Sequence, residues 1–168
     1  TCDSDTVNPP QEGFEEVVRD TVVVHLKDKS TGKFALLDWH GTLEGITTAI
    51  MGGIEAGQTA EGAVLAEIKE EAGLEDVKII KKLDWLSGAK YCASHKKQNR
   101  KSVVQGFLAE VESIKSQVEV DESEKAIHTL VWVNEDEVLE RLVPVHQKFI
   151  WQQLQHEEIV TSEDRKST

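Results

Sequence analysis

Three glutamates within one helical turn are the residues of this chain best placed to do chemistry. Glu67, Glu70 and Glu71 stand at positions i, i+3 and i+4, which share one face of an α-helix. Carboxylates this close repel one another and destabilise the helix unless a cation lies among them. Hard divalent metals take oxygen ligands and share them with substrate phosphates and water. The triplet therefore predicts a metal site, and the alternative is a solvated acidic helix face.

The residues before the triplet predict a short strand, a glycine-rich turn and a helix that position it. Thr59 is a favoured N-cap residue, and Gly73 stands where a helix commonly ends in the left-handed conformation. A strand over residues 47–51 would feed the turn, and such a junction can hold an anion at the helix N-terminus. Gly52 and Gly53 are therefore candidate phosphate-binding residues as well as turn residues. The residues expected to face the core are Val64, Leu65, Ile68 and Ala72.

This spacing resembles the Nudix box, in which a glycine, five residues, Glu and seven residues precede Arg-Glu-apolar-x-Glu-Glu-x-Gly-apolar. The matching residues are Gly52, Glu67, Ile68, Glu70, Glu71, Gly73 and Leu74. Two positions depart from the pattern, because Gln58 replaces the first Glu and Ala66 replaces the Arg. The resemblance implies a metal-dependent hydrolase that cleaves a nucleoside diphosphate linked to another group, by attack of water on phosphorus. It also implies Mg²⁺ or Mn²⁺ as cofactor and a small nucleotide as substrate.

The resemblance further implies roles for the individual carboxylates. Glu70 and Glu71 are expected as principal ligands and Glu67 as ligand or base, roles that the residues alone do not separate. Gln58 can coordinate through a neutral oxygen or serve only in the turn, and Ala66 removes a brace of the carboxylates. These departures keep an alternative open, a catalytically weak or inactive nucleotide-binding accessory domain.

A second and broader resemblance is to Nudix domains appended to some bacterial leucyl-tRNA synthetases. It spans residues 17–139 and is carried by short matches such as Leu37-Asp38-Trp39 and Val131-Trp132-Val133. It implies that the chain is part of a larger enzyme, and it fits a sequence that begins with Thr1 rather than Met.

Two further charged segments are candidates for the site. Residues 90–101 hold five Lys or Arg and no acid, so Lys96 and Arg100 are expected to bind phosphate oxygens. The alternative is an ordinary solvated loop. In the resembled family a distal loop often supplies an extra acid, which makes Glu124, or Glu122, a candidate, although a surface acid is the default. No histidine shows metal-ligand spacing, and the four tryptophans are expected mainly in the core.

Composition limits the class of protein. A chain of 168 residues supports one domain with a full core, over residues 14–160, between polar tails at 1–13 and 161–168. A net charge of −12 disfavours a general nucleic-acid or membrane-surface binder. Two cysteines make no disulfide framework, which favours a reducing, cytoplasmic compartment. The oligomeric state is left open.

The order of predicted elements indicates an α/β fold. Helices are expected at 134–142 and from Pro144 onward, and residues 112–124 as a loop. The order matches the α/β/α sandwich of the resembled family, a mixed sheet with the box helix on one face and the terminal helix on the other. The predicted strands are 17–27, 34–39, 47–51, 77–83, 85–92, 102–111 and 129–133.

Overall fold

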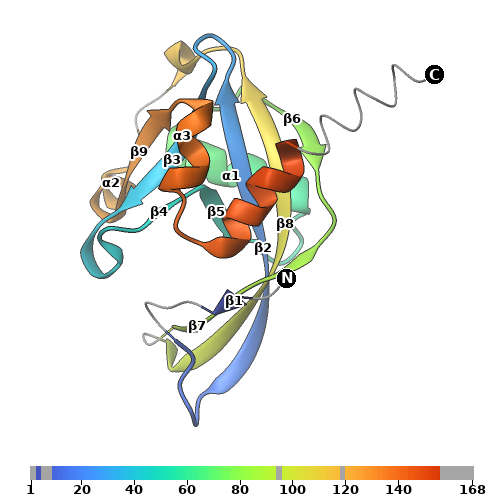
Figure 1. The fold of residues 1–168 in the computed structure, drawn as a ribbon, viewed down its shortest axis with the longest axis vertical. Coiled ribbons are helices and arrows are strands. Elements are labelled where there is room, and N and C mark those ends of the chain that lie inside the picture. The colour runs from blue at the N-terminus through green and yellow to red at the C-terminus, as the bar shows by residue number, and fades with distance from the viewer. Residues whose placement is uncertain (1–2, 5–8, 94–95, 118–119, 156–168) are drawn as a thin grey trace, which may run out of the picture.

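A computed structural model describes residues 3–4, 9–93, 96–117 and 120–155 and shows an α/β fold built on one mixed sheet. Its two longest strands, β2 (Glu15–Asp28) and β8 (Gln98–Val111), run parallel and pair along their whole lengths. Figure 1 shows them side by side through the centre of the molecule. The run of β-branched residues at 21–24 forms the buried middle of β2, as the sequence predicts.

The remaining strands extend this pair on both sides. β3 (Lys33–Trp39) pairs with β2, β4 (Thr47–Thr48) and β9 (His128–Val133), all antiparallel. β5 (Ile50–Gly53) pairs antiparallel with β2, with Gly52 opposite Val22. β6 (Val77–Lys82) and β7 (Leu86–Ala93) pair antiparallel with β8, and β1 (Asp3–Ser4) pairs parallel with β7.

Helices cover both faces of the sheet, which confirms the predicted sandwich. α1 (Ala60–Ala72) packs with Val22, Val24 and Phe107 in one core cluster. α3 (Glu135–Arg141) and the helix over residues 145–155 pack on the other face against Val23, Val104 and Leu108 (Figure 1). Gly106 lets the last helix approach, because a Cβ there would lie 2.6 Å from Cγ2 of Ile150. No helix in the described ranges is long and apolar enough to cross a membrane.

Part of the sheet leaves the body as an extended arm (Figure 1). It consists of β1, β7 and the neighbouring halves of β2 and β8. Residues 98–101, expected in a loop between the predicted strands 85–92 and 102–111, are strand, because β8 already begins at Gln98. These polar residues have low strand propensity, and they form a strand because of a contact with a distant segment. Glu15–Asp20 of β2 pairs in register with Gln98–Val103 of β8.

The expectation of a loop over 112–124 is also wrong. This segment contains a 3₁₀ turn, Ile114–Ser116, and the start of α2 (Glu122–Ile127). Asp121 caps α2, since its Oδ1 accepts a hydrogen bond from the backbone N–H of Ser123 at 3.0 Å. The same hydrogen bond is the main cause of a lowered pKa at Asp121. Another 3₁₀ turn, Gly41–Leu43, follows β3.

Candidate functional site

The helix that carries the three glutamates begins and ends where the sequence predicts. Thr59 Oγ1 accepts a hydrogen bond from the backbone N–H of Gly62 at 3.0 Å. Gly73 ends the helix with φ at 68°, the left-handed conformation that glycine adopts without strain. Because both ends are fixed, the rotation of α1 on the sheet decides where each glutamate points.

That rotation differs from the expected one. Ala63, Val64, Ile68, Glu71 and Ala72 are buried, and at 100° per residue Glu71 stands near the middle of their arc. Leu65, expected in the core, is 41% exposed, because it lies just outside this arc, beyond its Ala72 edge. The prediction for Leu65 is therefore wrong. A glutamate occupies the centre of the buried face, and the leucine faces solvent.

Glu67 lies against the backbone of the glycine turn. A Cβ on Gly52 would stand 2.1 Å from the Glu67 Cδ and 2.2 Å from its Oε1, so only glycine leaves room for this carboxylate. Gly52 is placed there by β5, whose pairing with Val22 of β2 turns its missing side chain toward α1. The sequence predicts both residues as site residues, and the structure brings them into contact.

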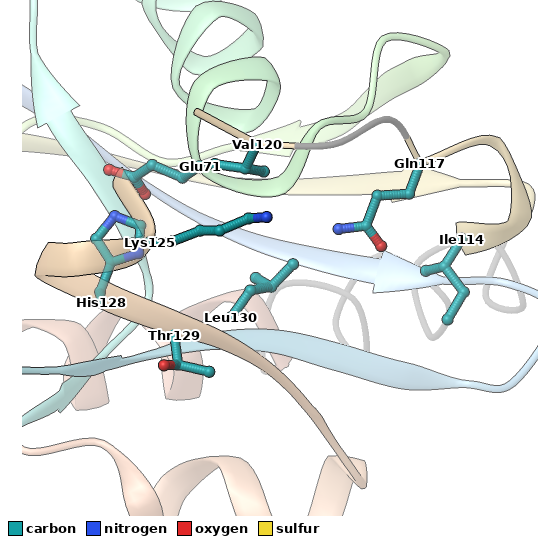
Figure 2. Close-up of a pocket in the computed structure, with 8 residues that line it drawn as sticks. All are labelled: Glu71, Ile114, Gln117, Val120, Lys125, His128, Thr129 and Leu130. Carbon is teal, nitrogen blue, oxygen red and sulfur yellow. The ribbon is translucent and has the colours of Figure 1, made fainter. Parts of the chain in front are cut away.

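Glu71 faces a cleft of about 610 Å³ between α1, β9 and the segment before α2. The Glu71 residue is 7% exposed, and Figure 2 shows its carboxylate pointing toward the His128 ring. Lys125 of α2 extends across the same cleft. The lining residues are Glu71, Ile114, Gln117, Val120, Lys125, His128, Thr129 and Leu130. A volume of this size is typical of a site for a small-molecule ligand.

His128 and Lys125 were missed by reasoning from the sequence. The His128 ring is 3% exposed and packs edge-on against Trp39, with ring centroids 5.1 Å apart. Trp39 is held in turn by a hydrogen bond from its Nε1 to Thr48 Oγ1 at 2.8 Å. A signal for His128 was present, since alternation along β9 places it on the same face as Leu130, which packs on the α1 side. Trp85, expected mainly in the core, is 45% exposed.

The structure shows what surrounds the two residues that depart from the box, Gln58 and Ala66. Gln58 Oε1 accepts a hydrogen bond from the backbone N–H of Glu55 at 3.0 Å, which closes the turn before α1. The amide oxygen of Gln58 is therefore already engaged in a hydrogen bond that stabilises the turn. Ala66, partly exposed on α1, ends at a methyl group and has no donor with which to hold a neighbouring carboxylate.

The other predicted residues lie in different places. Glu70 is exposed on α1, and Lys96 is exposed in the arm. Arg100 pairs with Val17 of β2, whereas Gly53 pairs with Thr21, so Arg100 and Gly53 are separated by ~13 Å along the strand direction. Glu124 is in α2, but its side chain falls outside the described part of the structure, as do His95 and residues 161–168.

The carboxylates on α1 have the chemistry of a site for a hard divalent ion. In the described ranges no group of three or more His, Cys, Asp or Glu side chains lies close enough to hold a metal by itself. Mg²⁺ does not need such a cage, because it usually takes one or two carboxylates, substrate phosphates and retained waters. Glu67 beside the glycine backbone and Glu71 in the cleft offer oxygen donors of that kind. The donor set therefore fits such an ion.

Comparisons with known proteins agree with this fold. Among solved structures, the chain is similar to the C. elegans Ap4A hydrolase, with a TM-score of 0.57 and 18% identity over 83% of this chain and 98% of that one. It is also similar to the E. coli dihydroneopterin triphosphate pyrophosphohydrolase, with a TM-score of 0.59 and 13% identity over 82% and 96% of the two chains. At these identities the likeness shows the fold alone. No curated protein sequence matches. A model of the NUDIX domain matches residues 17–153, most of the chain, and the chain therefore belongs to the NUDIX family.

Proposed function

We propose that this chain is a metal-dependent pyrophosphohydrolase that cleaves a nucleoside diphosphate linked to another group. The observation that carries the proposal is the contact between the Glu67 carboxylate and the Gly52 backbone, which joins an acidic helix to the candidate phosphate-binding turn. Family membership and the cleft beside Glu71 support it. The names of the structural neighbours, a hydrolase of Ap4A and a triphosphate pyrophosphohydrolase, are in keeping with this class of substrate.

The glutamates of α1 would have different roles in this reaction. Glu67, Glu70 and Glu71 would hold Mg²⁺ or Mn²⁺, which neutralises charge on the phosphate oxygens and lowers the pKa of an attacking water. Glu67 would act as ligand or as the base that accepts the proton of that water. Burial of Glu71 beside His128 fixes its carboxylate at the wall of the cleft. The missing side chain at Gly52 lets the Glu67 carboxylate lie directly beside the backbone that would bind phosphate.

The experiment is a panel of nucleotide sugars, dinucleoside polyphosphates, ADP-ribose and nucleoside triphosphates, each with and without Mg²⁺ or Mn²⁺. We expect metal-dependent turnover of at least one substrate. Glu67→Gln and Glu71→Gln should each lower kcat by about 10²–10⁴-fold. The matched control is Glu75→Gln, an exposed carboxylate just beyond the same helix that pairs with Lys69, and it should change kcat by less than about twofold. Turnover by no substrate, or equal loss in all three variants, contradicts the proposal.

The setting of Gln58 favours a second candidate function, a nucleotide-binding domain with little or no turnover. Its amide oxygen is engaged by Glu55, and an amide brings one negative charge fewer than the carboxylate of the family pattern. Such a domain would serve as an accessory part of a larger enzyme, for example a leucyl-tRNA synthetase. It predicts nucleotide binding by calorimetry without product formation.

A rescue experiment separates the two candidates. Under the second one, restoring the family residues with Gln58→Glu and Ala66→Arg should create or raise hydrolysis by about 10–100-fold. Under the first, the unmodified chain already turns over, and the double substitution adds less. Binding without hydrolysis in both proteins would mean that the cleft itself has lost the geometry for the reaction.

A further inference from the structure

Arg19 lies on the same glycine turn as Glu67 but on the opposite face of the sheet. A Cβ on Gly53 would stand 2.3 Å from a terminal nitrogen of Arg19, so the guanidinium rests directly on the Gly53 backbone. Gly52 and Gly53 are adjacent residues, ~3.3 Å apart along β5. The carboxylate of Glu67 and the guanidinium of Arg19 therefore contact one short stretch of backbone from its two sides. β5 pairs only with β2 among the described strands, so its outer edge is not closed by another strand.

A second arginine shares the face of Arg19. Arg19 pairs with Ser102 of β8, and Arg100 stands two residues earlier on that strand, which places it on the same side of the sheet. Diagonal neighbours of this kind are ~7–8 Å apart. Tyr91 of β7 pairs with Arg100 and extends the same face. We call Arg19, Tyr91 and Arg100 the arginine face of the arm.

The donors of this face are largely unused. Arg19 makes no hydrogen bond or ion pair within the described part of the chain, and it is only partly exposed. Arg100 donates its Nε to Gln98 Oε1 at 2.9 Å, which leaves its terminal nitrogens for other partners. The acid of β2 that shares this face is Glu15, which is exposed toward the tip of the arm and pairs with Gln98 rather than with either arginine.

We propose that the arginine face binds the distal phosphates of a substrate that carries three or more phosphates in a chain. Two guanidiniums held side by side repel each other, and a polyphosphate removes that repulsion by accepting paired hydrogen bonds from both. The chain would cross the open edge of β5, with the phosphate under attack on the Glu67 side and the remaining phosphates on the Arg19 side. A nucleic-acid strand fits less well, since the net charge of −12 repels a long polyanion.

This inference rests on the proposed function in one respect, which is that the phosphate under attack lies on the Glu67 side. Its binding part does not need turnover. Tripolyphosphate is the probe, titrated by calorimetry into the full chain at low salt with EDTA present, so that neither metal nor hydrolysis contributes. The variants are Arg19→Gln, Arg19→Lys and Arg100→Gln. The matched control is Lys101→Gln, because Lys101 is next to Arg100 on β8 but points to the other face of the sheet.

Arg19→Gln and Arg100→Gln should each weaken tripolyphosphate binding about tenfold, and Arg19→Lys should lose part of that amount because a lysine cannot bind bidentately. Lys101→Gln should change it by less than about twofold. With an active enzyme, Arg19→Gln should raise KM for a nucleoside tetraphosphate more than KM for a nucleotide sugar. The proposal is overturned if the chain does not bind tripolyphosphate, or if Lys101→Gln weakens binding as much as Arg19→Gln. Neither result bears on the proposed hydrolase activity, because the substrate panel tests that activity separately.

Discussion

Gly52 and Glu67 form the contact on which the geometry of the site depends most. The glutamate approaches the backbone so closely that a single methyl group at position 52 would overlap its carboxylate. Glycine at this position is thus required by space rather than by an unusual φ angle. The requirement couples a residue of the sheet to a residue of the helix that covers it, and it makes the glycine as important for the site as the acid.

Gly52→Ala should therefore displace the Glu67 carboxylate and lower kcat by about 10–100-fold, the usual cost of losing a positioning contact. The backbone fold should be retained, since β5 keeps its pairing with β2. The measurement is steady-state kinetics with circular dichroism as the folding check. In a Glu67→Gln background the same substitution should add little. An equal further loss in that background would show that Gly52 acts independently of Glu67.

His25 is a titratable residue whose effect is on stability rather than on the site. It is fully buried beside Trp151, with ring centroids 5.0 Å apart, and burial lowers its pKa from 6.5 to about 4. Between these values the unfolded chain takes up a proton that the folded chain does not. The free energy of unfolding should therefore fall as pH decreases from 6.5 toward 4, by as much as about 3 kcal/mol.

Denaturant unfolding measures the free energy of unfolding across this pH range. In His25→Leu this free energy should fall less steeply as pH decreases, because the contribution of His25 is gone. The substitution replaces the imidazole with an apolar side chain of similar size, which suits the core position. A slope unchanged in His25→Leu would mean that other groups cause the pH dependence.

Gln147 links two elements, the last helix and the strand that leads to the glycine turn. It is fully buried, and its Oε1 accepts a hydrogen bond from the backbone N–H of Ala49 at 2.7 Å. Its Nε2 donates to the Met51 sulfur at 3.1 Å. The helix thus holds the start of β5, at contacts four and two residues before the Gly53 end of the strand. This is how a helix on the far face of the sheet contributes to the position of the site.

Gln147→Leu should leave the Ala49 N–H buried without a partner and lower the free energy of unfolding by about 1–3 kcal/mol. The matched control is Gln152→Leu, on the exposed side of the same helix, which should change it by less than about 0.5 kcal/mol. Chemical denaturation compares the two. A similar effect of both variants would indicate that helix propensity, and not the buried hydrogen bond, determines the result.

The elements show which kinds of structure were predictable. Thr59 and Gly73 define α1 through local capping chemistry, so its ends could be predicted from the sequence. Leu65 was misplaced because the buried arc of the helix contains a glutamate, which a hydrophobic pattern does not anticipate. The strand at 98–101 was missed because its pairing partner is β2, more than eighty residues earlier in the chain. The cap of α2 at Asp121 was a local signal that went unused.

At the scale of the whole molecule, the sheet separates two cores, and the two proposals concern residues on different faces of that sheet. The core under α1 supports Glu67 and Glu71, and the core under the last helix lies on the same face as Arg19. The spacing of the box was enough to predict this sandwich. His128 lies beside Glu71 and Arg19 lies beside Gly53 only through the folding of distant segments, so no short motif identifies them. The fold was thus more predictable than the complete site.

The most direct test of metal-dependent water attack on phosphorus is to identify the product that carries the oxygen of the water. The reaction is run on a dinucleoside tetraphosphate or a nucleotide sugar in water enriched in heavy oxygen, with Mg²⁺ present, and the products are analysed by mass spectrometry. We expect one heavy oxygen on a phosphate of the products, with no labelled product when the metal is removed or when Glu67 is replaced by Gln. Label in a non-phosphate product, or labelled phosphate still formed by Glu67→Gln at the original rate, would contradict it.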